Sequence, residues 1–373
     1  KLGSWCNYQR QDKKTGKLSN EKILLNLSNP IGKNKLILDT DTANEIDDQF
    51  ALAWTLLSGD KINLLGVTAE PYSFQHHKEE LLEAYNTIKE KKEISKDNIN
   101  LVNNYSDWVN GLIESNIHPN DIYFDTPKEG VEKSYQEIIK IFDKLKIPHE
   151  GKVFRGSDQY LSSFDKPLIT ESSEFIVKSC LQYPDEKIYV CAIGCLTNIA
   201  SALLMEPKII NNLIVVWTSG FPTHSINNNT NSLNLVQDVL SSQLLFECGV
   251  ANVYLPGYNV GAQLTLSLPD MKEFVKGRGD IGNYLYELYT NNPLHKQRGV
   301  SDQTWRTWVI WDVINIAWMI EASWVPSHIV SSPILNDELY WKRNNESHPM
   351  REAYGVNRDA IFHDFFTKID KLK

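Results

Sequence analysis

The chain has 373 residues, of which 42% are hydrophobic and 23% charged, as expected of a globular protein that buries a full-sized core. Its net charge of −9 argues against a nucleic-acid partner, because binding a polyanion requires clustered cations. No apolar run reaches membrane-spanning length, so we expect no membrane insertion. The five cysteines lie mostly in apolar runs, which predicts buried thiols rather than a zinc site.

Residues 1–34 are polar and weakly patterned, which predicts an N-terminal arm ahead of one domain spanning 35–373. A short element is expected near Ile23 to Leu27. The chain begins at Lys1 rather than Met, so a targeting signal would be invisible. We expect a cytoplasmic protein, with secretion as the alternative.

Strands and helices alternate through most of 35–255, which predicts an α/β fold: a single Rossmann-like domain with a mainly parallel central sheet flanked by helices. An irregular insertion is expected over 92–150, with helical pieces near Trp108 and 134–145. The tryptophan-rich stretch 303–324 indicates a helix whose aromatic side chains pack in the core. The predicted strands are 35–38, 61–69, 187–193, 213–217 and 251–255, with order returning after the insertion at 153–157. The clearest helices are 49–57, 171–182, 239–247 and an amphipathic helix near 358–366.

Five acidic residues lie between the first strand and the first helix of the domain, and no Lys or Arg interrupts them. Like charges so close raise the pKa of one another unless a positive charge sits among them. A bound hard cation that takes oxygen ligands, Ca²⁺ or Mg²⁺, is the simplest way to offset this repulsion. An EF-hand loop is excluded, because Asn44 and Phe50 stand where it needs Gly and Glu. A solvated acidic turn is the plain alternative. The five residues are Asp39, Asp41, Glu45, Asp47 and Asp48.

Four segments, in order, give the chain a resemblance to the nucleoside hydrolase family over about residues 35–330. The acidic loop resembles the family's metal loop, although its turn, Thr42 to Ile46, is longer and indicates a divergent branch. Gly194 to Ala200 closely matches the Gly-x-Leu-Thr-Asn-x-Ala signature. Ser232 to Asp238 resembles Glu-Phe-Asn-x-x-x-Asp, and Trp311-Asp312 stands where the family usually has His-Asp.

The resemblance implies a Ca²⁺ ion and a general base. The ion would be held by Asp41, Asp48, Asp312 and the backbone carbonyl of Ile193, and Asp41 would take the proton from the attacking water. Asp39 would support the loop from behind these ligands. Thr197 and Asp238, within the matching segments, are expected to cap the helices that follow them.

The resemblance also implies residues for the substrate. Asp47 and Asn234 would hold the 2′ and 3′ hydroxyls of a ribose. Trp311 would stack on the base in place of the missing His, and His77 could contact the base. Ser232 replaces a Glu that holds the outer hydroxyl of the sugar, which leaves sugar selectivity open.

The function implied is Ca²⁺-dependent hydrolysis of the N-glycosidic bond of a ribonucleoside, by a protein expected to form a homo-oligomer. One alternative is a nucleoside- or sugar-binding protein on the same fold, suggested by the changes at Ser232 and Trp311. Another is a haloacid-dehalogenase-type phosphatase with Asp39 as nucleophile, which leaves Glu45, Asp47 and Asp48 unexplained.

Overall fold

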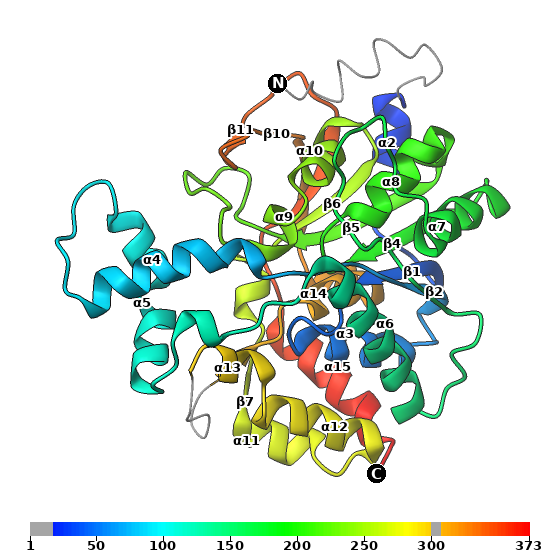
Figure 1. Ribbon diagram of the computed structural model, residues 1–373. Helices are drawn as coiled ribbons and strands as arrows, with labels where there is room; N and C mark the ends of the chain where they lie inside the picture. The colour runs from blue at the N-terminus through cyan, green and yellow to red at the C-terminus, as the bar shows by residue number, and fades with distance from the viewer. Residues whose placement is uncertain (1–17, 300–306) are drawn as a thin grey trace.

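The computed structural model describes residues 18–299 and 307–373, and its centre is an eight-stranded sheet (Figure 1). All neighbouring strands are parallel except β12 and β9, which are antiparallel. The α/β fold with a mainly parallel sheet is therefore confirmed. In spatial order the strands are β3 (Val153–Phe154), β2 (Ile62–Ala69), β1 (Asn34–Thr40), β4 (Ile188–Ala192), β5 (Leu213–Ser219), β6 (Ala251–Pro256), β12 (Pro349–Ala353) and β9 (Ser327–Ser331).

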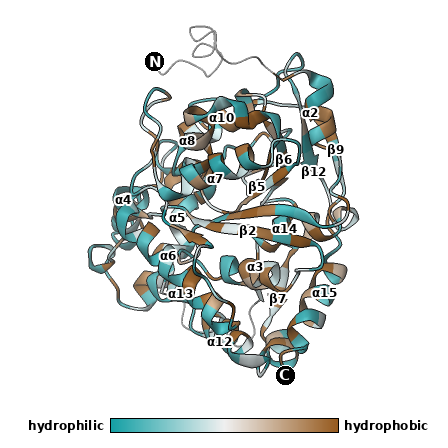
Figure 2. Ribbon diagram, turned by 90° about the vertical axis from the view of Figure 1, so that its right-hand side faces the viewer, coloured by the Kyte–Doolittle hydropathy of each residue, from teal (hydrophilic) through white to brown (hydrophobic). Residues whose placement is uncertain are grey.

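Helices cover both faces of this sheet, as Figure 2 shows from the side. They pack in two separate hydrophobic clusters, one on each face, because parallel strands are apolar on both sides. One layer contains α3 (Asp47–Leu56), α6 (Pro127–Lys144), α12 (Gly279–Thr290), α14 (Val313–Ile320) and α15 (Arg358–Asp370). The other contains α7 (Glu171–Gln182), α8 (Thr197–Met205) and α10 (Val239–Glu247).

The helices α4 (Lys78–Lys89) and α5 (Ile99–Glu114) pair as a hairpin that projects from the body of the molecule (Figure 1). They have a hydrophobic cluster of their own. The smaller elements are α2 (Asn20–Asn26), α9 (Leu233–Val236), α11 (Leu268–Asp270) and α13 (Pro293–Gln297), and the two-stranded pairs β7 (Thr265–Ser267) with β8 (Thr307–Val309) and β10 (Ile334–Leu335) with β11 (Trp341–Lys342).

Two expectations about secondary structure were wrong. The helical pieces expected near Trp108 and over 134–145 are present, but they belong to the long helices α5 and α6, so the segment 92–150 is not irregular. Helix α6 begins with Pro127 after a capping box made by Thr126 and Glu129, a strong start signal. The tryptophan-rich stretch is not one helix, since strand β8 precedes α14. Trp305 lies outside the described residues.

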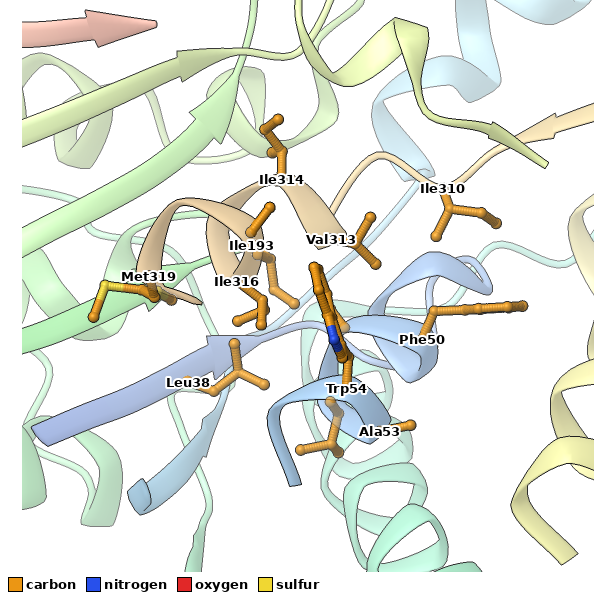
Figure 3. Packing of buried hydrophobic residues seen from close by; sticks show 14 of the residues in the cluster. Leu38, Phe50, Ala53, Trp54, Ile193, Ile310, Val313, Ile314, Ile316 and Met319 are labelled. Atoms are coloured by element: carbon orange, nitrogen blue, oxygen red, sulfur yellow. The ribbon is translucent and has the colours of Figure 1, made fainter. Parts of the chain in front are cut away.

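The core holds α3 and α14 together under the sheet (Figure 3). The fully buried Trp54 of α3 lies beside Val313 of α14, and its indole N–H donates to Asp364 Oδ2 at 2.8 Å. Leu38 of β1 belongs to the same cluster. This packing fixes the N-terminal ends of α3 and α14 relative to β1.

The N-terminal arm and the cysteines agree with the expectations from the sequence. Helix α2 occupies the end of the predicted arm and packs against β12 and β6. Four of the cysteines are buried thiols, as predicted, and Cys6 lies outside the described residues. Within 18–299 and 307–373, no helix has the length and apolar character needed to cross a bilayer.

Candidate active site

The acidic loop joins the carboxyl end of β1 to the first turn of α3. Two hydrogen bonds shape it: Thr40 Oγ1 donates to Asp48 Oδ1 at 2.6 Å, and Asn44 Nδ2 donates to Asp41 Oδ2 at 2.9 Å. Asp47 and Asp48 open the helix, where negative side chains interact favourably with the helix dipole. The loop thus gathers its carboxylates at the edge of the sheet where ligands bind in α/β folds.

Three buried carboxylates meet at this point. Single oxygens of Asp47, Asp48 and Asp312 all lie within 4.8 Å of one another. Asp312 arrives from the far end of the chain as the residue before α14. Two further oxygens, Asp41 Oδ1 and Asp48 Oδ2, are buried without a hydrogen-bond partner. Unpartnered carboxylate oxygens at this density suit a hard cation such as Ca²⁺ or Mg²⁺.

Burial and mutual repulsion oppose ionisation of the cluster. The pKa of Asp41 is raised well above its usual range by burial and then by the charges of Asp48, Asp47 and Glu45. Burial, followed by neighbouring carboxylates, likewise raises the pKa of Asp47 and Asp312. Burial raises the pKa of Asp48, although the hydrogen bonds it accepts oppose that effect. The metal-free site therefore resists full ionisation.

These shifts predict how stability depends on pH. Because the folded metal-free protein binds these protons more tightly than the unfolded chain, its stability falls as pH rises from about 4 through the raised pKa values. We expect the melting temperature in EDTA to be lower at pH 8 than at pH 5.5, and saturating Ca²⁺ to reduce that difference. Thermal unfolding at both pH values checks this, and a metal-free melting temperature that rises with pH would contradict it.

The predicted backbone ligand lies at the end of β4. The Ile193 carbonyl accepts a hydrogen bond from Asn234 Nδ2 at 3.3 Å, and this amide also donates to the Thr218 carbonyl at 2.9 Å. The side chain of Asn234 therefore bridges the ends of β4 and β5. The turn after Ile193 is held by Trp217, whose indole N–H donates to the Gly194 carbonyl at 3.0 Å.

The helix-cap expectations have different outcomes. Thr197 does not cap α8, because the helix begins at Thr197 itself and its hydroxyl donates to Asp238 Oδ2 at 2.5 Å. Asp238 does cap α10, accepting from the Ser241 amide at 3.1 Å. Asp238 thus connects two loops at the sheet edge as well as beginning a helix.

Asp39 is buried behind the other carboxylates. Its Oδ1 accepts from Thr68 Oγ1 at 2.6 Å and from Asn198 Nδ2 at 3.0 Å. Glu70, which the sequence argument missed, lies against it and accepts from the Asn198 amide at 2.9 Å. Burial and the charge of Asp39 raise the pKa of Glu70 well above its usual range. Glu70 directly follows the predicted strand 61–69, and an acid at that edge of the sheet is the signal that could have identified it.

A cavity of about 950 Å³ opens above the carboxylates. That volume is at the upper end of the range for small-molecule sites. Asp39, Asp41 and Asp48 are buried and do not line it. Six of the predicted site residues do line it: Asp47, His77, Ile193, Asn234, Trp311 and Asp312.

His77 lies in the aromatic part of the wall. Its Nδ1 is 2.8 Å from the Tyr105 hydroxyl, and its ring meets that of Trp108 edge-on at 5.5 Å. Burial, and then the charges of His76 and Arg298, lower the pKa of His77 to about 3. His77 is therefore uncharged near neutral pH.

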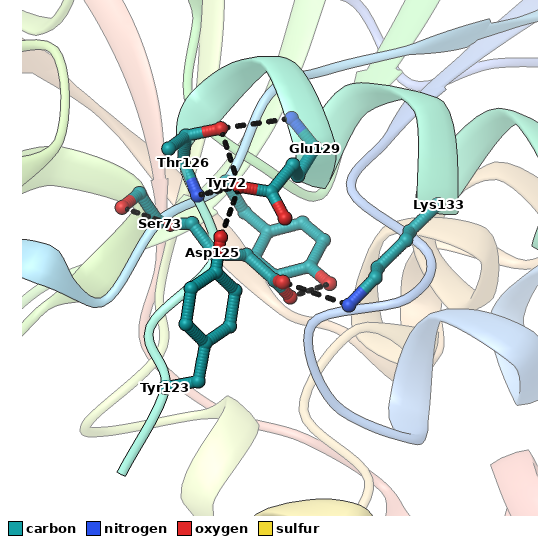
Figure 4. Close-up of polar contacts among 7 residues, drawn as sticks. All are labelled: Tyr72, Ser73, Tyr123, Asp125, Thr126, Glu129 and Lys133. Atoms are coloured by element: carbon teal, nitrogen blue, oxygen red, sulfur yellow. Dashed lines mark hydrogen bonds and ion pairs between the residues drawn. The ribbon is translucent and has the colours of Figure 1, made fainter. Parts of the chain in front are cut away.

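A polar cluster fixes the segment that leads to His77 (Figure 4). Asp125 accepts from the Tyr72 hydroxyl at 3.1 Å and pairs with Lys133 at 2.7 Å, and its backbone carbonyl accepts from Ser73 Oγ at 2.7 Å. Gly130 packs so closely on the Tyr72 carbonyl that a Cβ there would collide with it. Helix α6 thus anchors the loop between β2 and α4.

The two departures from the family pattern both face the cavity. Trp311 meets the Tyr258 ring at 6.0 Å and 90°. Ser232 Oγ is 2.6 Å from Ser219 Oγ and accepts from the Gly220 amide at 2.9 Å. The Ser232 hydroxyl is therefore turned toward the end of β5.

The other lining residues include four that had no predicted role in the site: Glu45, Tyr258, Arg298 and Trp308. Tyr258 follows the end of β6, and its position at the sheet edge could have identified it. Glu45 was counted among the acids but given no role. Arg298 carries no local sequence signal.

Comparison with known proteins assigns most of the chain to one protein family. Residues 36–362 match the family described as inosine-uridine preferring nucleoside hydrolase. The probable uridine nucleosidase 2 of Arabidopsis thaliana is 26% identical over 162 residues, which are 43% of this chain and 49% of that protein. The match thus spans about half the length of that relative.

Solved structures show the same fold at low sequence identity. A purine-preferring ribonucleoside hydrolase from Gardnerella vaginalis aligns with a TM-score of 0.60 and 19% identity, over 91% of this chain and 99% of that one. An inosine-uridine preferring nucleoside hydrolase from Bacillus anthracis aligns with a TM-score of 0.56 and 17% identity, over 91% and 99%.

Proposed function

Because this chain belongs to the inosine-uridine preferring nucleoside hydrolase family, we propose that it hydrolyses the N-glycosidic bond of a ribonucleoside with Ca²⁺ bound at its carboxylate cluster. The observation that carries the proposal is the buried cluster of Asp47, Asp48 and Asp312 at the floor of a large cavity. Carboxylates that are costly to bury persist where function needs them.

Asp41, Asp48, Asp312 and the Ile193 carbonyl would hold the ion. The unpartnered oxygens of Asp41 and Asp48 support this assignment, because burial without a partner is unfavourable for a carboxylate. When bound, the ion supplies positive charge that offsets these carboxylates and makes a nearby water more acidic. Oxygen-only ligation favours Ca²⁺ or Mg²⁺ over zinc, and the family resemblance favours Ca²⁺.

The chain's own side chains would then divide the reaction between them. Asp41 Oδ1 takes a proton from the water that attacks the anomeric carbon. Asp47 and Asn234 face the cavity beside the cluster and orient the ribose hydroxyls. The bond from the anomeric carbon to the base nitrogen breaks through an oxocarbenium-like state, which the surrounding carboxylates stabilise.

The two alternatives differ in how well the geometry supports them. A binding protein without catalysis would keep the same cavity, so only an assay separates it from the hydrolase. The phosphatase would need Asp39 as an exposed nucleophile. Asp39 Oδ1 instead accepts hydrogen bonds from Thr68 and Asn198, which engage it in holding the loop and argue against that reaction.

A reducing-sugar assay across purine and pyrimidine ribonucleosides, with added Ca²⁺ and then with a chelator, tests the proposal. We expect release of ribose and free base that chelation abolishes and Ca²⁺ restores. Nucleoside binding without release of base on long incubation would support the binding protein. Sugar release that the chelator leaves unchanged would contradict the role of the metal.

A further inference from the structure

Arg298 places a positive charge in the wall of an otherwise acidic cavity. Among the described residues that line the cavity it is the only Lys or Arg, whereas Glu45, Asp47, Asp107, Glu114 and Asp312 are acidic. Its guanidinium lies over the ring of Trp108, 5.2 Å from the ring centre. Its Nε is buried and has no hydrogen-bond partner within 18–299 and 307–373. A buried donor without a partner is unfavourable unless a ligand satisfies it.

The backbone at Arg298 is held rigidly by helix α5. A Cβ on Gly111 would collide with the Arg298 carbonyl, and one on Gly299 would collide with the Gly111 carbonyl. Ser115 Oγ donates to the Gly299 carbonyl at 2.9 Å, and the Trp108 indole N–H donates to the Gln297 carbonyl at 3.3 Å. Helix α5 therefore fixes the position of the backbone from which the Arg298 side chain extends.

The charge of Arg298 acts on the aromatic end of the cavity. It opposes the effect of burial on the pKa of Glu45, and it opposes the rise that burial causes in the pKa of Tyr258. Tyr258 in turn meets the ring of Trp311, the neighbour of Asp312. With the sugar held at Asp47 and Asn234, as proposed above, the aromatic rings of this end are the surface left for the base.

On the basis of the proposed function, we propose that Arg298 is a further catalytic residue, whose guanidinium donates a hydrogen bond to the departing base. As the bond to the anomeric carbon breaks, its electron pair moves onto the base nitrogen and the ring becomes negatively charged. A preorganised positive donor stabilises that charge. Water supplies the oxygen that joins the anomeric carbon.

Arg298 differs from a general acid because it donates a hydrogen bond to the departing base without transferring a proton to it. A guanidinium keeps its charge throughout the working pH range and does not give up a proton. The base therefore leaves as a hydrogen-bonded anion and takes its proton from solvent water afterwards, while Asp41 receives the proton of the attacking water. The effect of Arg298 must depend on how poor the leaving group is.

The test compares two kinds of substrate with R298Q in the full chain with Ca²⁺. We expect kcat/KM for ribonucleosides to fall about 100-fold, the loss typical of one such donor. For p-nitrophenyl riboside, whose leaving group is a stable anion, we expect a change of less than about threefold. R298K keeps the charge without the planar fork and should recover part of the nucleoside activity.

The exposed Arg343 supplies the matched control, and R343Q should leave both substrates unaffected. Equal losses on both substrates in R298Q, or no loss on either, would overturn the inference while the hydrolase assignment stands. If R298Q does not fold, as judged by its melting temperature, R298K decides by the same substrate comparison. Wild-type protein that cleaves neither substrate would overturn the proposed function and this inference with it.

Discussion

D41N is expected to lower kcat for ribonucleosides by about 10³-fold at saturating Ca²⁺, which is within the range that a general base contributes. Asp41 Oδ2 accepts a hydrogen bond from Asn44, whereas Oδ1 is buried without a partner and therefore free to take a proton. An amide has nearly the same shape but cannot act as a base. The substitution also removes one acid from a repelling cluster, so we expect the metal-free protein to fold at least as stably as wild type.

The kinetic loss must be separated from weaker metal binding, because Asp41 is also a proposed ligand. Measuring kcat against Ca²⁺ concentration does this, since a pure binding defect disappears at saturation. D60N is the matched control: Asp60 is exposed and does not line the cavity, and its conversion should leave kcat unchanged. Near-normal turnover by D41N at saturating Ca²⁺ would remove Asp41 from the chemistry.

The sequence was sufficient to predict those parts of the fold and the site that depend on residues close together in the chain. Alternating apolar runs and helix signals indicate the parallel sheet, because each βαβ unit has its own periodicity. Asp47 and Asp48 could be located in the same way, since a strand, a short loop and a helix start bring them to the sheet edge. Asp312 is different. Asp312 and Asp48 are separated by most of the chain, and only the family resemblance predicted that they lie close together in space.

The remaining residues depend on contacts that no local pattern reveals. Arg298 reaches the cavity because two glycines, Gly111 and Gly299, let α5 approach the end of α13. The insertion 92–150 was expected to be irregular because it is rich in Asn and Pro, yet Pro127 and Thr126 are helix-start residues. Reading Pro as a break rather than as a first helical residue caused that error.

D312N should have effects of opposite sign with and without Ca²⁺. In a chelator the variant is expected to melt at a higher temperature than wild type. Burial and then the charges of Asp47 and Asp48 oppose ionisation of Asp312, and the uncharged amide avoids both effects. With Ca²⁺ present the order should reverse. A ligand at 100 times its Kd stabilises the folded state by about 2.7 kcal/mol, and a variant that binds the ion poorly gains little.

The reversal distinguishes a metal site from a structural cluster. If the three carboxylates of Asp47, Asp48 and Asp312 only shared protons, Ca²⁺ would shift both proteins equally and the variant would remain the more stable one. Thermal unfolding of both proteins in chelator and in Ca²⁺, with calorimetric titration of the ion, measures the two effects separately. Nucleoside turnover by D312N should fall at least as far as metal occupancy does. The carboxylates that repel one another in the empty site are the proposed ligands of the ion, and the proposed reaction requires the bound ion.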